Sequence, residues 1–548
     1  MTGLPENAAL LDFLAKPEAY GLDACEEIRR IDTHASHVFL AGTRAYKMKR
    51  PVRFTFLDFS TLEKRKAACD REVELNRRTA PDIYLGVVPV RRVGRGFRLD
   101  GGEGEIADYL VEMKRFGDEG LLATLAGSGE LTLPLVEELA AEVAAFHRMA
   151  EVRRDFGGAE GTARIVAGSE EDMRESIGLV LDADEAQAVT AKSRALISRH
   201  RALLDERRAQ GWVRHCHGDL HLGNVTEIGG KPVIFDCVEF SDHIARIDTL
   251  YDLAFLLMDL AFRGESDERL RGFANRALNV YLDHLTAEEI GDATRGLALL
   301  PLFVSMRAVV RAKVTAVQAK GGNDGKRDLA RAYLDFAGRA LKPCPVRLVA
   351  VGGLSGTGKS TLAKQLAGTI GGTVGAVHLR TDTIRKRMFG AGPLDRLPAE
   401  AYARDAGERV YAEMTQLATL ALDAGMSVVA DAVFATEEER RAVAELAVAS
   451  GVRFDGLWLE APASVLEARV AARERQGRDP SDAGVAVLKR QLGYDLGEMT
   501  WVRADASGTP EEALAVARAT IDTADARAIR TRKSNRPFAM RKKPVGLS

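Results

Sequence analysis

Three polar residues near the middle of the chain have the types and the spacing of a site that handles a proton and a divalent metal ion. Asp219 lies in the string HGDLHLGN (217–224), Asn224 follows five residues later, and Asp236 follows the apolar pair Ile234-Phe235. Phosphoryl transfer to a hydroxyl needs one carboxylate beside the acceptor, and an amide and a second carboxylate on the metal. The order Asp, Asn, Asp therefore predicts phosphoryl-transfer chemistry in this part of the chain.

A glycine-rich segment about 130 residues later predicts a second phosphate site. Residues 353–360, GLSGTGKS, satisfy the pattern G-x-x-x-x-G-K-[ST], with an apolar strand-like run before them and a helical run after them. Glycines allow backbone N–H groups to turn toward phosphate, the lysine reaches the β- and γ-phosphates, and the serine ligates Mg²⁺. The predicted nucleotide-binding residues are Gly353, Ser355, Gly356, Thr357, Gly358, Lys359, Ser360 and Thr361, with Ser360 also on the metal.

The HGDxHxxN string resembles the aminoglycoside phosphotransferase and choline-kinase group of small-molecule kinases, over about residues 30–340. The resemblance implies that Asp219 orients or deprotonates the acceptor hydroxyl, and that Asn224 and Asp236 hold Mg²⁺. Asp236 is followed by Cys-Val-Glu. Small-molecule kinases generally also lack Phe-Gly after this aspartate.

A kinase of this type also needs a lysine on the ATP phosphates and a helical glutamate that orients the lysine. Lys47 lies on a strand-like run, and Glu72 lies on the helix predicted for residues 62–79, so these two form the predicted pair. Lys49 and Glu74 are close competitors for the same roles.

The parts of a kinase that cover phosphate and bind adenine have weaker sequence signals. No GxGxxG pattern precedes Lys47, and the candidate turns are Thr33-His34-Ala35-Ser36 and Gly42-Thr43. The segment Val111-Glu112-Met113 fits the place of the connection between two lobes, so we predict that backbone groups at Met113 bind adenine.

Four further residues around the first site are predicted to be structural. The segment 217–224, which carries Asp219, is called the catalytic loop. His217 and His221 are interpreted as structural histidines of this loop, because Mg²⁺ already has its oxygen ligands. Asp248 and Asp252, on the next helix, are predicted to brace the loop by hydrogen bonds.

Beyond the glycine-rich segment, the string VHLRTDTIR (377–385) places Asp382 at the end of a predicted strand, with Arg385 three residues later. The D-x-x-R pattern resembles P-loop kinases of the polynucleotide kinase, gluconate kinase and zeta-toxin type, over about residues 346–500. An Asp at this strand edge can take the acceptor proton, and Arg385 can hold an anionic group. Asp431, which ends another predicted strand, would contact a Mg²⁺-bound water or the substrate.

Four arginines follow on the helix predicted for residues 464–476 and in the loop after it: Arg469, Arg473, Arg475 and Arg478. Small P-loop kinases close an arginine-bearing lid over the triphosphate, where an arginine stabilises charge in the transition state. We predict Arg473, followed by Arg469, for this role. No long apolar strand ends in Asp-Glu, which favours a small kinase over a mechanical ATPase.

The pattern of helices and strands predicts several domains. The predicted fold class is multidomain, α+β and α/β: a bilobal, protein-kinase-like domain precedes a P-loop domain with a doubly wound parallel sheet. A hairpin around Gly229-Gly230 is predicted to return Asp236 to Asn224. The predicted parts are a helical leader (1–30), a kinase domain (31–341) with a small lobe (31–113) and a large lobe (114–341), a linker (342–345), the P-loop domain (346–525) and a basic tail (526–548).

Composition agrees with several soluble domains in a reducing compartment. The chain of 548 residues is too long for one core, and 46% hydrophobic and 28% charged residues are typical of globular proteins. The net charge of −2 gives no general signal for nucleic acid or membrane, and the five cysteines form no CxxC pair. The N-terminus lacks a secretory pattern, and the apolar stretch 250–262 is short and contains two acids, so we predict a cytoplasmic protein.

These patterns predict a bifunctional phosphotransferase that uses ATP and Mg²⁺ to phosphorylate hydroxyl groups of small molecules at two sites. The sequence does not distinguish ATP from GTP. One alternative is a single catalytic domain that is regulated by a nucleotide-sensing P-loop module. Another is a polynucleotide kinase acting on RNA 5′-hydroxyls, with nucleic acid as a partner of the basic tail. No membrane partner is expected.

Overall fold

The computed structural model describes residues 2–3, 8–33, 35–53, 57–99, 101–319, 323–392, 394–476 and 481–521. The chain divides into two compact units, Met1–Cys344 with Gly372–Gly375, and Pro345–Gly371 with Ala376–Ser548. The predicted basic tail, 526–548, lies outside the described residues. No helix among the described residues is both long and apolar enough to cross a membrane.

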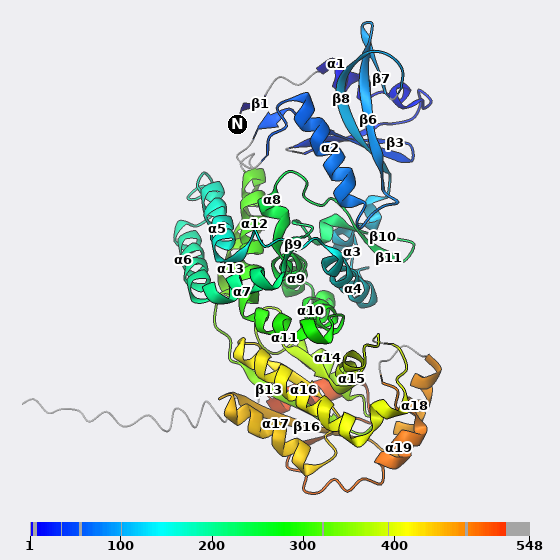
Figure 1. Ribbon diagram of the computed structural model, residues 1–548, viewed down its shortest axis with the longest axis vertical. Helices are drawn as coiled ribbons and strands as arrows, with labels where there is room; N and C mark the ends of the chain where they lie inside the picture. Colours follow the sequence, from blue (N-terminus) through cyan, green and yellow to red (C-terminus); the bar gives the residue numbers. More distant parts are fainter. Residues whose placement is uncertain are drawn as a thin grey trace, which may run out of the picture. The chain divides into compact units, whose positions relative to one another are not determined.

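The small lobe of the first unit is a six-stranded antiparallel sheet in the order β2-β3-β4-β8-β6-β7 (Figure 1). Helix α2 (Leu62–Asn76) packs on the central strands β8 and β6. It begins after Thr61, whose side chain accepts a hydrogen bond from the backbone N–H of Lys64. The strands are β2 (Arg29–Asp32), β3 (Ser36–Ala41), β4 (Arg44–Lys49), β6 (Tyr84–Val93), β7 (Gly96–Leu99) and β8 (Glu105–Lys114).

The segment predicted as a helical leader, 1–30, contributes to this small lobe. Helix α1 (Ala8–Leu14) buries Leu10, Leu11 and Leu14 in one cluster with Phe39 of β3. Burial of these side chains removes apolar surface from water, which ties the start of the chain to the sheet. The two-residue strands β1 (Thr2–Gly3) and β5 (Val52–Arg53) pair with each other in antiparallel orientation.

The large lobe of the first unit is mainly helical and surrounds helix α9 (Thr249–Ser266). Most of α9 is buried on all sides, which explains the apolar stretch in the sequence without a membrane span. The short strand elements are the pair β9 (Val213–His215) and β12 (Arg246–Asp248), and the hairpin β10 (Val225–Ile228) and β11 (Lys231–Ile234). The helices are α3 (Leu122–Ser128), α4 (Leu133–Met149), α5 (Gly158–Met173), α6 (Ala183–Arg199), α7 (Arg201–Gln210), α8 (Asp242–Ala245), α10 (Phe273–Asp283), α11 (Ala287–Gly296), α12 (Leu300–Ala319) and α13 (Asp324–Ala340).

The second unit is a five-stranded parallel sheet in the order β14-β15-β13-β16-β17, with helices between the strands. The predicted doubly wound sheet is therefore confirmed, and β17 is a strand that the sequence pattern did not reveal. The carboxyl ends of parallel strands meet at one edge, where open α/β sheets bind ligands. The elements are β13 (Arg347–Gly353), α14 (Lys359–Ala367), β14 (Val377–Arg380), α15 (Thr381–Met388), α16 (Arg404–Asp423), β15 (Val428–Asp431), α17 (Glu437–Ala449), β16 (Arg453–Glu460), α18 (Ala463–Gln476), α19 (Val485–Gln491) and β17 (Val502–Asp505).

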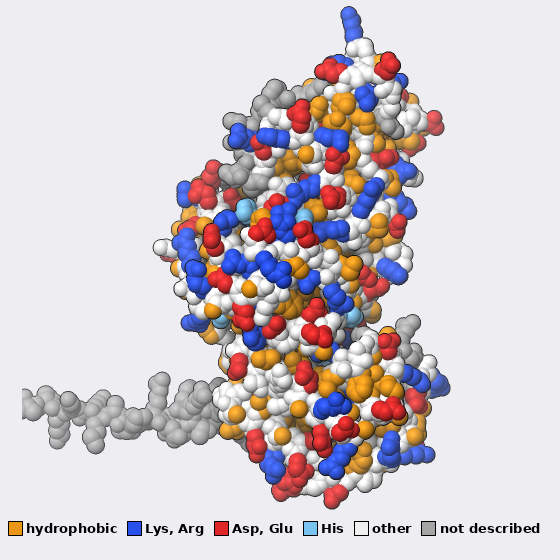
Figure 2. Space-filling view, viewed as in Figure 1, with side chains coloured by type: hydrophobic (Ala, Val, Ile, Leu, Met, Phe, Trp, Pro, Cys, Tyr) orange, Lys and Arg blue, Asp and Glu red, His pale blue; other side chains and the backbone are white. Residues whose placement is uncertain are grey.

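Basic and acidic side chains alternate over the visible surface of each unit (Figure 2). Many of these residues form ion pairs one helical turn apart, such as Arg404 with Glu408 and Arg164 with Glu160. Exposed pairs of this kind contribute little to stability, at about 0.2–1 kcal/mol each. The buried ion pairs of both units are therefore the ones that bear on function.

Candidate functional site

The hairpin that follows the catalytic loop brings two predicted metal ligands together. Gly229 and Gly230 both have positive φ, 61° and 82°, which is the conformation that a two-residue hairpin turn requires. The backbone N–H of Phe235 donates to the carbonyl of Asn224 at 3.0 Å. Asp236 therefore leaves the hairpin beside Asn224, which confirms the predicted return of the chain.

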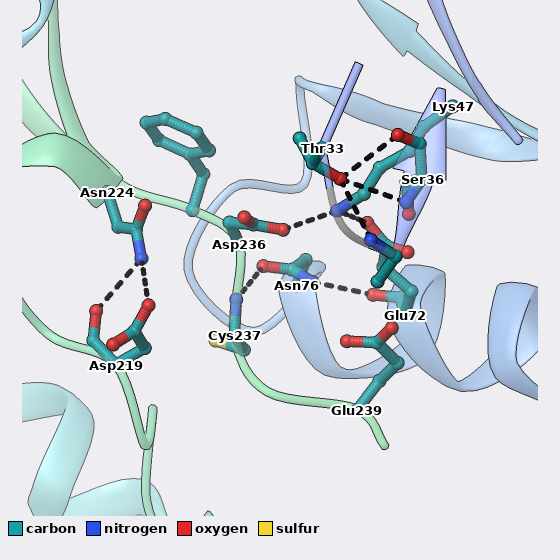
Figure 3. Close-up of polar contacts among 12 residues, drawn as sticks. Thr33, Ser36, Lys47, Glu72, Asn76, Asp219, Asn224, Asp236, Cys237 and Glu239 are labelled. Carbon is teal, nitrogen blue, oxygen red and sulfur yellow. Dashed lines mark hydrogen bonds and ion pairs between the residues drawn. The ribbon is translucent and has the colours of Figure 1, made fainter. Parts of the chain in front are cut away.

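Asn224 also holds the predicted catalytic carboxylate. Its Nδ2 donates to the backbone carbonyl of Asp219 at 2.9 Å and to Asp219 Oδ2 at 3.0 Å (Figure 3). The Asp219 side chain is 40% exposed, so an acceptor can reach it. Burial acts to raise the pKa of Asp219, but His221, His217 and Arg307 outweigh it and hold the pKa below its ordinary value. Asp219 is therefore ionised and able to orient a hydroxyl or receive its proton.

The catalytic loop is held from below by helix α9. Asp252 accepts hydrogen bonds from the backbone N–H groups of His217 at 3.0 Å and Gly218 at 2.9 Å, which confirms its predicted bracing role. The same prediction was wrong for Asp248, which instead accepts two hydrogen bonds from Arg207 at 2.8 and 2.7 Å. Arg207 is buried, so its guanidinium needs a carboxylate partner of its own.

Lys47 on β4 lies where two carboxylates meet. Its Nζ donates to Glu72 Oε1 at 2.8 Å and to Asp236 Oδ1 at 2.6 Å (Figure 3). Lys49, two residues along the same strand, is buried and pairs with Glu72 and with Glu239. Lys49 is therefore a neighbour of Lys47 in one cluster. Glu239 was not predicted, and the only available signal was an acid three residues after Asp236.

Charge balance inside this cluster shifts the pKa values of its members. Burial acts to raise the pKa of Glu72, but Lys47 and Lys49 lower it from 4.5 to about 2. Burial acts to lower the pKa of Lys47, but Asp236, Glu72 and Glu239 raise it well above its ordinary value. The stability that ionised Glu72 contributes is present above pH 4.5 and is lost as the pH falls toward 2.

Helix α2, which carries Glu72, is fixed to the large lobe at its C-terminal end. Asn76 Oδ1 accepts a hydrogen bond from the backbone N–H of Cys237 at 2.8 Å (Figure 3). Arg78, just after the helix, donates to the backbone carbonyl of His215 at 2.7 Å. These contacts and the ion pairs of Lys47 hold the lysine, the glutamate and the metal-side carboxylate in one arrangement.

The two candidate phosphate turns lie at opposite ends of β3. The Thr33 hydroxyl oxygen accepts a hydrogen bond from the backbone N–H of Ser36 at 2.9 Å, and His34 between them is outside the described residues. The Gly42-Thr43 turn binds the connection between the lobes, because the Arg115 N–H donates to the Thr43 carbonyl at 2.9 Å. The Thr33–Ser36 turn is therefore the candidate that remains for covering phosphate.

The predicted connection between the lobes needs a correction. Residues 111–113 lie inside β8, where β4 and β6 pair with them on both sides. Met113 is opposed by Ala45 and Tyr84, so its backbone belongs to a central strand. The apolar run gave no sign of where the strand ends, and the chain leaves the sheet only after Lys114. Adenine binding at this strand end stays a prediction.

In the second unit, the glycine-rich loop joins β13 to α14, and a cavity of about 290 Å³ lies over this loop. Its lining includes the predicted residues from Gly356 to Thr361, whereas Gly353 and Ser355 do not line it. Helix α18 lies close to the loop, because a Cβ on Gly356 would be 2.7 Å from the Leu466 carbonyl oxygen. The cavity is lined by Gly356, Thr357, Gly358, Lys359, Ser360, Thr361, Leu362, Arg380, Leu459, Arg469, Arg473, Ala506, Gly508, Thr509, Pro510 and Ala513.

The predicted acids of the second site lie at the carboxyl edge of the sheet, with an arginine between them. Asp431 ends β15 and is 1% exposed, and Asp382 lies in the first turn of α15. Arg380 Nη2 lies 3.3 Å from Asp382 Oδ2, and Arg380 Nε lies 3.8 Å from Asp431 Oδ2. Arg380 was not predicted, although its place at a strand end beside the D-x-x-R string was visible in the sequence.

The other predicted arginines are held by backbone carbonyls. Arg385 donates to the carbonyl of Ala401 and lies over the Tyr402 ring, 5.1 Å from its centroid. Arg469 and Arg473 line the cavity as predicted for lid arginines. Arg469 donates to the carbonyls of the 506–508 loop, and Arg473 donates to the carbonyl of Ala483.

Helix α19 supports the glycine-rich loop from outside the cavity. Gln491 Oε1 accepts a hydrogen bond from the backbone N–H of Ser355 at 2.8 Å, and both residues are buried. Leu488 of the same helix packs in a small core beside Leu354 of the loop. Gln491 is 131 residues beyond the end of the GLSGTGKS string, so no local spacing could have revealed it.

Both units offer oxygen atoms that suit Mg²⁺, which prefers carboxylate, amide and hydroxyl oxygens. In the first unit, Asn224 donates through Nδ2 to Asp219, which leaves Oδ1 for a metal, and Asp236 has a second carboxylate oxygen. In the second unit, both carboxylate oxygens of Asp431 are buried, and Oδ2 lies 3.4 Å from His378 Nε2 and 3.8 Å from Arg380 Nε. Ser360 lines the adjoining cavity. The residues of both sites therefore fit a divalent metal.

Comparison with known families divides the chain in the same way. Residues 28–289 match the profile of the phosphotransferase enzyme family, and residues 348–494 match that of an AAA domain. The "Uncharacterized protein Rv2004c" of Mycobacterium tuberculosis is 31% identical over 495 residues, which cover 88% of this chain and 93% of that protein. A protein of Mycobacterium bovis is similar to the same extent.

Two solved structures are similar to parts of the chain. A gluconokinase from Sinorhizobium meliloti is 22% identical, covers 35% of this chain and 99% of its own, and has a TM-score of 0.26. A choline kinase from Cryptosporidium parvum is 12% identical, covers 61% of this chain and 92% of its own, and has a TM-score of 0.38.

Replacing Glu72 with Gln removes one negative charge from between the buried Lys49 and Lys47, whose side chain is 15% exposed. We expect the Glu72→Gln variant to unfold more easily by roughly 3–5 kcal/mol, because breaking a buried pair leaves an uncompensated charge. We also expect phosphoryl transfer at the first site to fall about tenfold or more, because Lys47 loses its orienting carboxylate. Thermal unfolding and ATP kinetics measure the two effects. Glu74→Gln, exposed on the same helix, is the matched control, and equal losses in both variants would contradict this assignment.

Replacing Gln491 with Leu keeps its size but removes the acceptor for the Ser355 N–H. We expect a loss of about 1–3 kcal/mol in stability, because a buried donor is left without a partner. ATP binding to the second unit should weaken about tenfold, as titration calorimetry can measure. Lys489→Ala, exposed on the same helix, should change neither quantity. Unchanged ATP affinity in Gln491→Leu would mean that the loop does not depend on α19.

Proposed function

Because the chain belongs to the family of the Mycobacterium tuberculosis protein Rv2004c, and joins a phosphotransferase-family domain to an AAA domain, we propose that it carries two ATP-dependent phosphotransferase sites. The chain is a kinase-type enzyme, and each site would phosphorylate a hydroxyl group of a small molecule. The observation that carries the proposal is the contact of Lys47 with both Glu72 and Asp236, beside the pair Asp219 and Asn224.

At the first site, the residues divide the work of phosphoryl transfer. Lys47 would bind ATP phosphate oxygens, and Glu72 would keep its ammonium group in place. Asp219 would orient the acceptor hydroxyl and receive its proton as the oxygen attacks the γ-phosphorus. Asn224 and Asp236 would hold Mg²⁺, which neutralises charge on the phosphates when bound.

At the second site, the glycine-rich loop would bind the triphosphate through backbone N–H groups and Lys359. Asp382 is 27% exposed at the carboxyl edge of the sheet, which suits a group that receives the acceptor proton. Ser360 and Asp431 would hold the metal. This set of residues supports a kinase over a nucleotide-sensing module, because a sensor needs no base beside the phosphate.

The nucleic-acid alternative is based on the basic tail and on the resemblance to polynucleotide kinases. The basic tail that would favour it lies outside the described residues. The charged groups that line the second cavity are cations suited to a triphosphate, which a small-molecule kinase and a polynucleotide kinase would share. Small-molecule acceptors therefore remain the proposal for both sites.

Transfer of ³²P from γ-labelled ATP tests the two sites together. The full-length protein, Asp219→Asn and Lys359→Ala would each be incubated with a cell metabolite extract and, separately, with an RNA pool. We expect two sets of labelled small molecules, one lost in Asp219→Asn and the other lost in Lys359→Ala. If the single change Asp219→Asn removes all labelled products, the regulatory alternative is favoured, because the second site then transfers no phosphate. Label on RNA that Lys359→Ala removes would favour the polynucleotide kinase.

Replacing Asp382 with Asn tests whether the second site transfers phosphate or only binds nucleotide. We expect Asp382→Asn, in the full-length protein, to lose the products that depend on Lys359 by about 100-fold or more, because the acceptor proton has no base. ATP affinity should stay within about threefold of the wild type, because the glycine-rich loop is unchanged. Normal transfer by Asp382→Asn would rule out this role, and Asp395→Asn serves as the matched control.

A further inference from the structure

Arg380 stands between the carboxylates of the second site and the cavity above the glycine-rich loop. It is the last residue of β14, is 5% exposed and lies opposite Asp431 in the sheet. Its guanidinium lies 3.3 Å from Asp382 and 3.8 Å from Asp431. Arg380 also lines the cavity that contains Lys359. One buried cation therefore faces the proposed base, the proposed metal ligand and the phosphate cavity.

The other lining arginines are bound differently. Arg469 donates to the carbonyls of Ala506 at 2.7 Å and Gly508 at 2.9 Å, which fixes the loop after β17. Arg473 donates to the carbonyl of Ala483. Both guanidinium groups are thus bound to backbone carbonyls, and those that Arg469 contacts at Ala506 and Gly508 belong to the cavity lining. Arg380 instead faces carboxylates that would change partners during the reaction.

The charge around Lys359 agrees with this arrangement. Burial lowers the pKa of Lys359, Asp431 and Asp382 oppose that effect, and Arg380 and Arg473 add to it. The charged residues among the described lining of the cavity are cations. A group with several negative charges is therefore the ligand that this cavity favours.

We propose that Arg380 is a catalytic residue of the P-loop site, whose guanidinium binds the phosphoryl group in transfer and orients Asp382 toward the acceptor hydroxyl. The proposal rests on the proposed kinase function of this site. Guanidinium carries five N–H donors in a planar fork, so it can contact a phosphoryl oxygen and keep a carboxylate contact at the same time.

The acceptor oxygen forms a bond to the γ-phosphorus while the bond from that phosphorus to the β–γ bridging oxygen breaks. The electron pair of the broken bond stays on ADP, and the acceptor proton moves to Asp382. Negative charge on the equatorial phosphoryl oxygens is then close to Arg380, which is positively charged throughout.

Arg380 also shares Asp431 with the metal. Both the guanidinium and Mg²⁺ would compensate the same buried carboxylate. Removing the guanidinium should therefore strengthen Mg²⁺ binding while it weakens catalysis. A residue that only supported the fold would not shift these two quantities in opposite directions.

The test uses the full-length protein with Asp219→Asn to silence the first site. Arg380→Gln and Arg380→Lys are compared with Arg441→Gln, an exposed arginine on α17. Calorimetry measures the affinity for Mg²⁺-ADP alone and for Mg²⁺-ADP with aluminium fluoride, which imitates the transferring phosphoryl group. Titration of Mg²⁺ at fixed ADP gives the metal affinity, and ATP hydrolysis gives the rate.

We expect Arg380→Gln to bind Mg²⁺-ADP within about threefold of its parent and the fluoride complex about tenfold or more weakly. ATP turnover should fall about 10³-fold, as for other catalytic arginines. Arg380→Lys should lie between these values, and Arg441→Gln should match the parent. Mg²⁺ should bind Arg380→Gln more tightly.

An equal loss of affinity for both complexes, or no loss for either, would overturn the role of Arg380. If the parent itself binds the fluoride complex no better than ADP and turns over no ATP, the proposed kinase function of the second site fails. That outcome is distinct, because it appears before any change at Arg380. Thermal unfolding of each variant identifies one that has lost its fold, and Arg380→Lys then decides the question.

Discussion

A buried charge without a partner costs several kcal/mol, and this constraint decides where the charged side chains of both candidate sites lie. Glu72 is fully buried and is tolerable only because Lys47 and Lys49 flank it. Lys47 in turn reaches Asp236 across the lobes of the first unit. The position of the small-lobe sheet, helix α2 and the hairpin that ends at Asp236 all follow from satisfying these charges at once.

The same constraint acts on the loop that carries Asp219, the proposed catalytic carboxylate. Helix α9 is apolar nearly all round, yet it contains Asp252, which is fully buried. Its carboxylate is stabilised by backbone N–H groups of the catalytic loop and by His147. An acid that interrupts an apolar helix is therefore a binding point for the loop above it, and this is why α9 lies at the centre of the large lobe.

The two units meet similar chemical demands with different architectures. In the first unit, an antiparallel sheet supplies the cation and a hairpin returns the metal-side acid. In the second unit, parallel strands end at one edge, so that Arg380, Asp431 and the glycine-rich loop converge without a hairpin. In both, a cation contacts the carboxylates that would act on metal or acceptor. The similarity to the Mycobacterium tuberculosis relative covers 88% of the chain and therefore extends over both units.

The sequence by itself determined the parts of each site that local spacing defines. Asp219, Asn224 and Asp236 fall within one short stretch, and Lys359 and Ser360 fall within one loop, so their relative positions follow from turns and hairpins. The pairing of Lys47 with Glu72 could be predicted because a kinase of this type needs a lysine on the ATP phosphates and a helical glutamate that orients it. The end of β8 could not be placed, because an apolar run does not mark where pairing stops.

Only the tertiary structure decided the partners that come from distant segments. Glu239 reaches Lys49 across 190 residues, Gln491 reaches Ser355 across 136, and Arg380 meets Asp431 through strand register. Asp248 and Asp252 are both aspartates and lie four residues apart, yet only packing shows that one binds Arg207 and the other the catalytic loop. Each such choice depends on which buried charge or N–H group lacks a partner, and that is a property of the packed chain rather than of any local pattern.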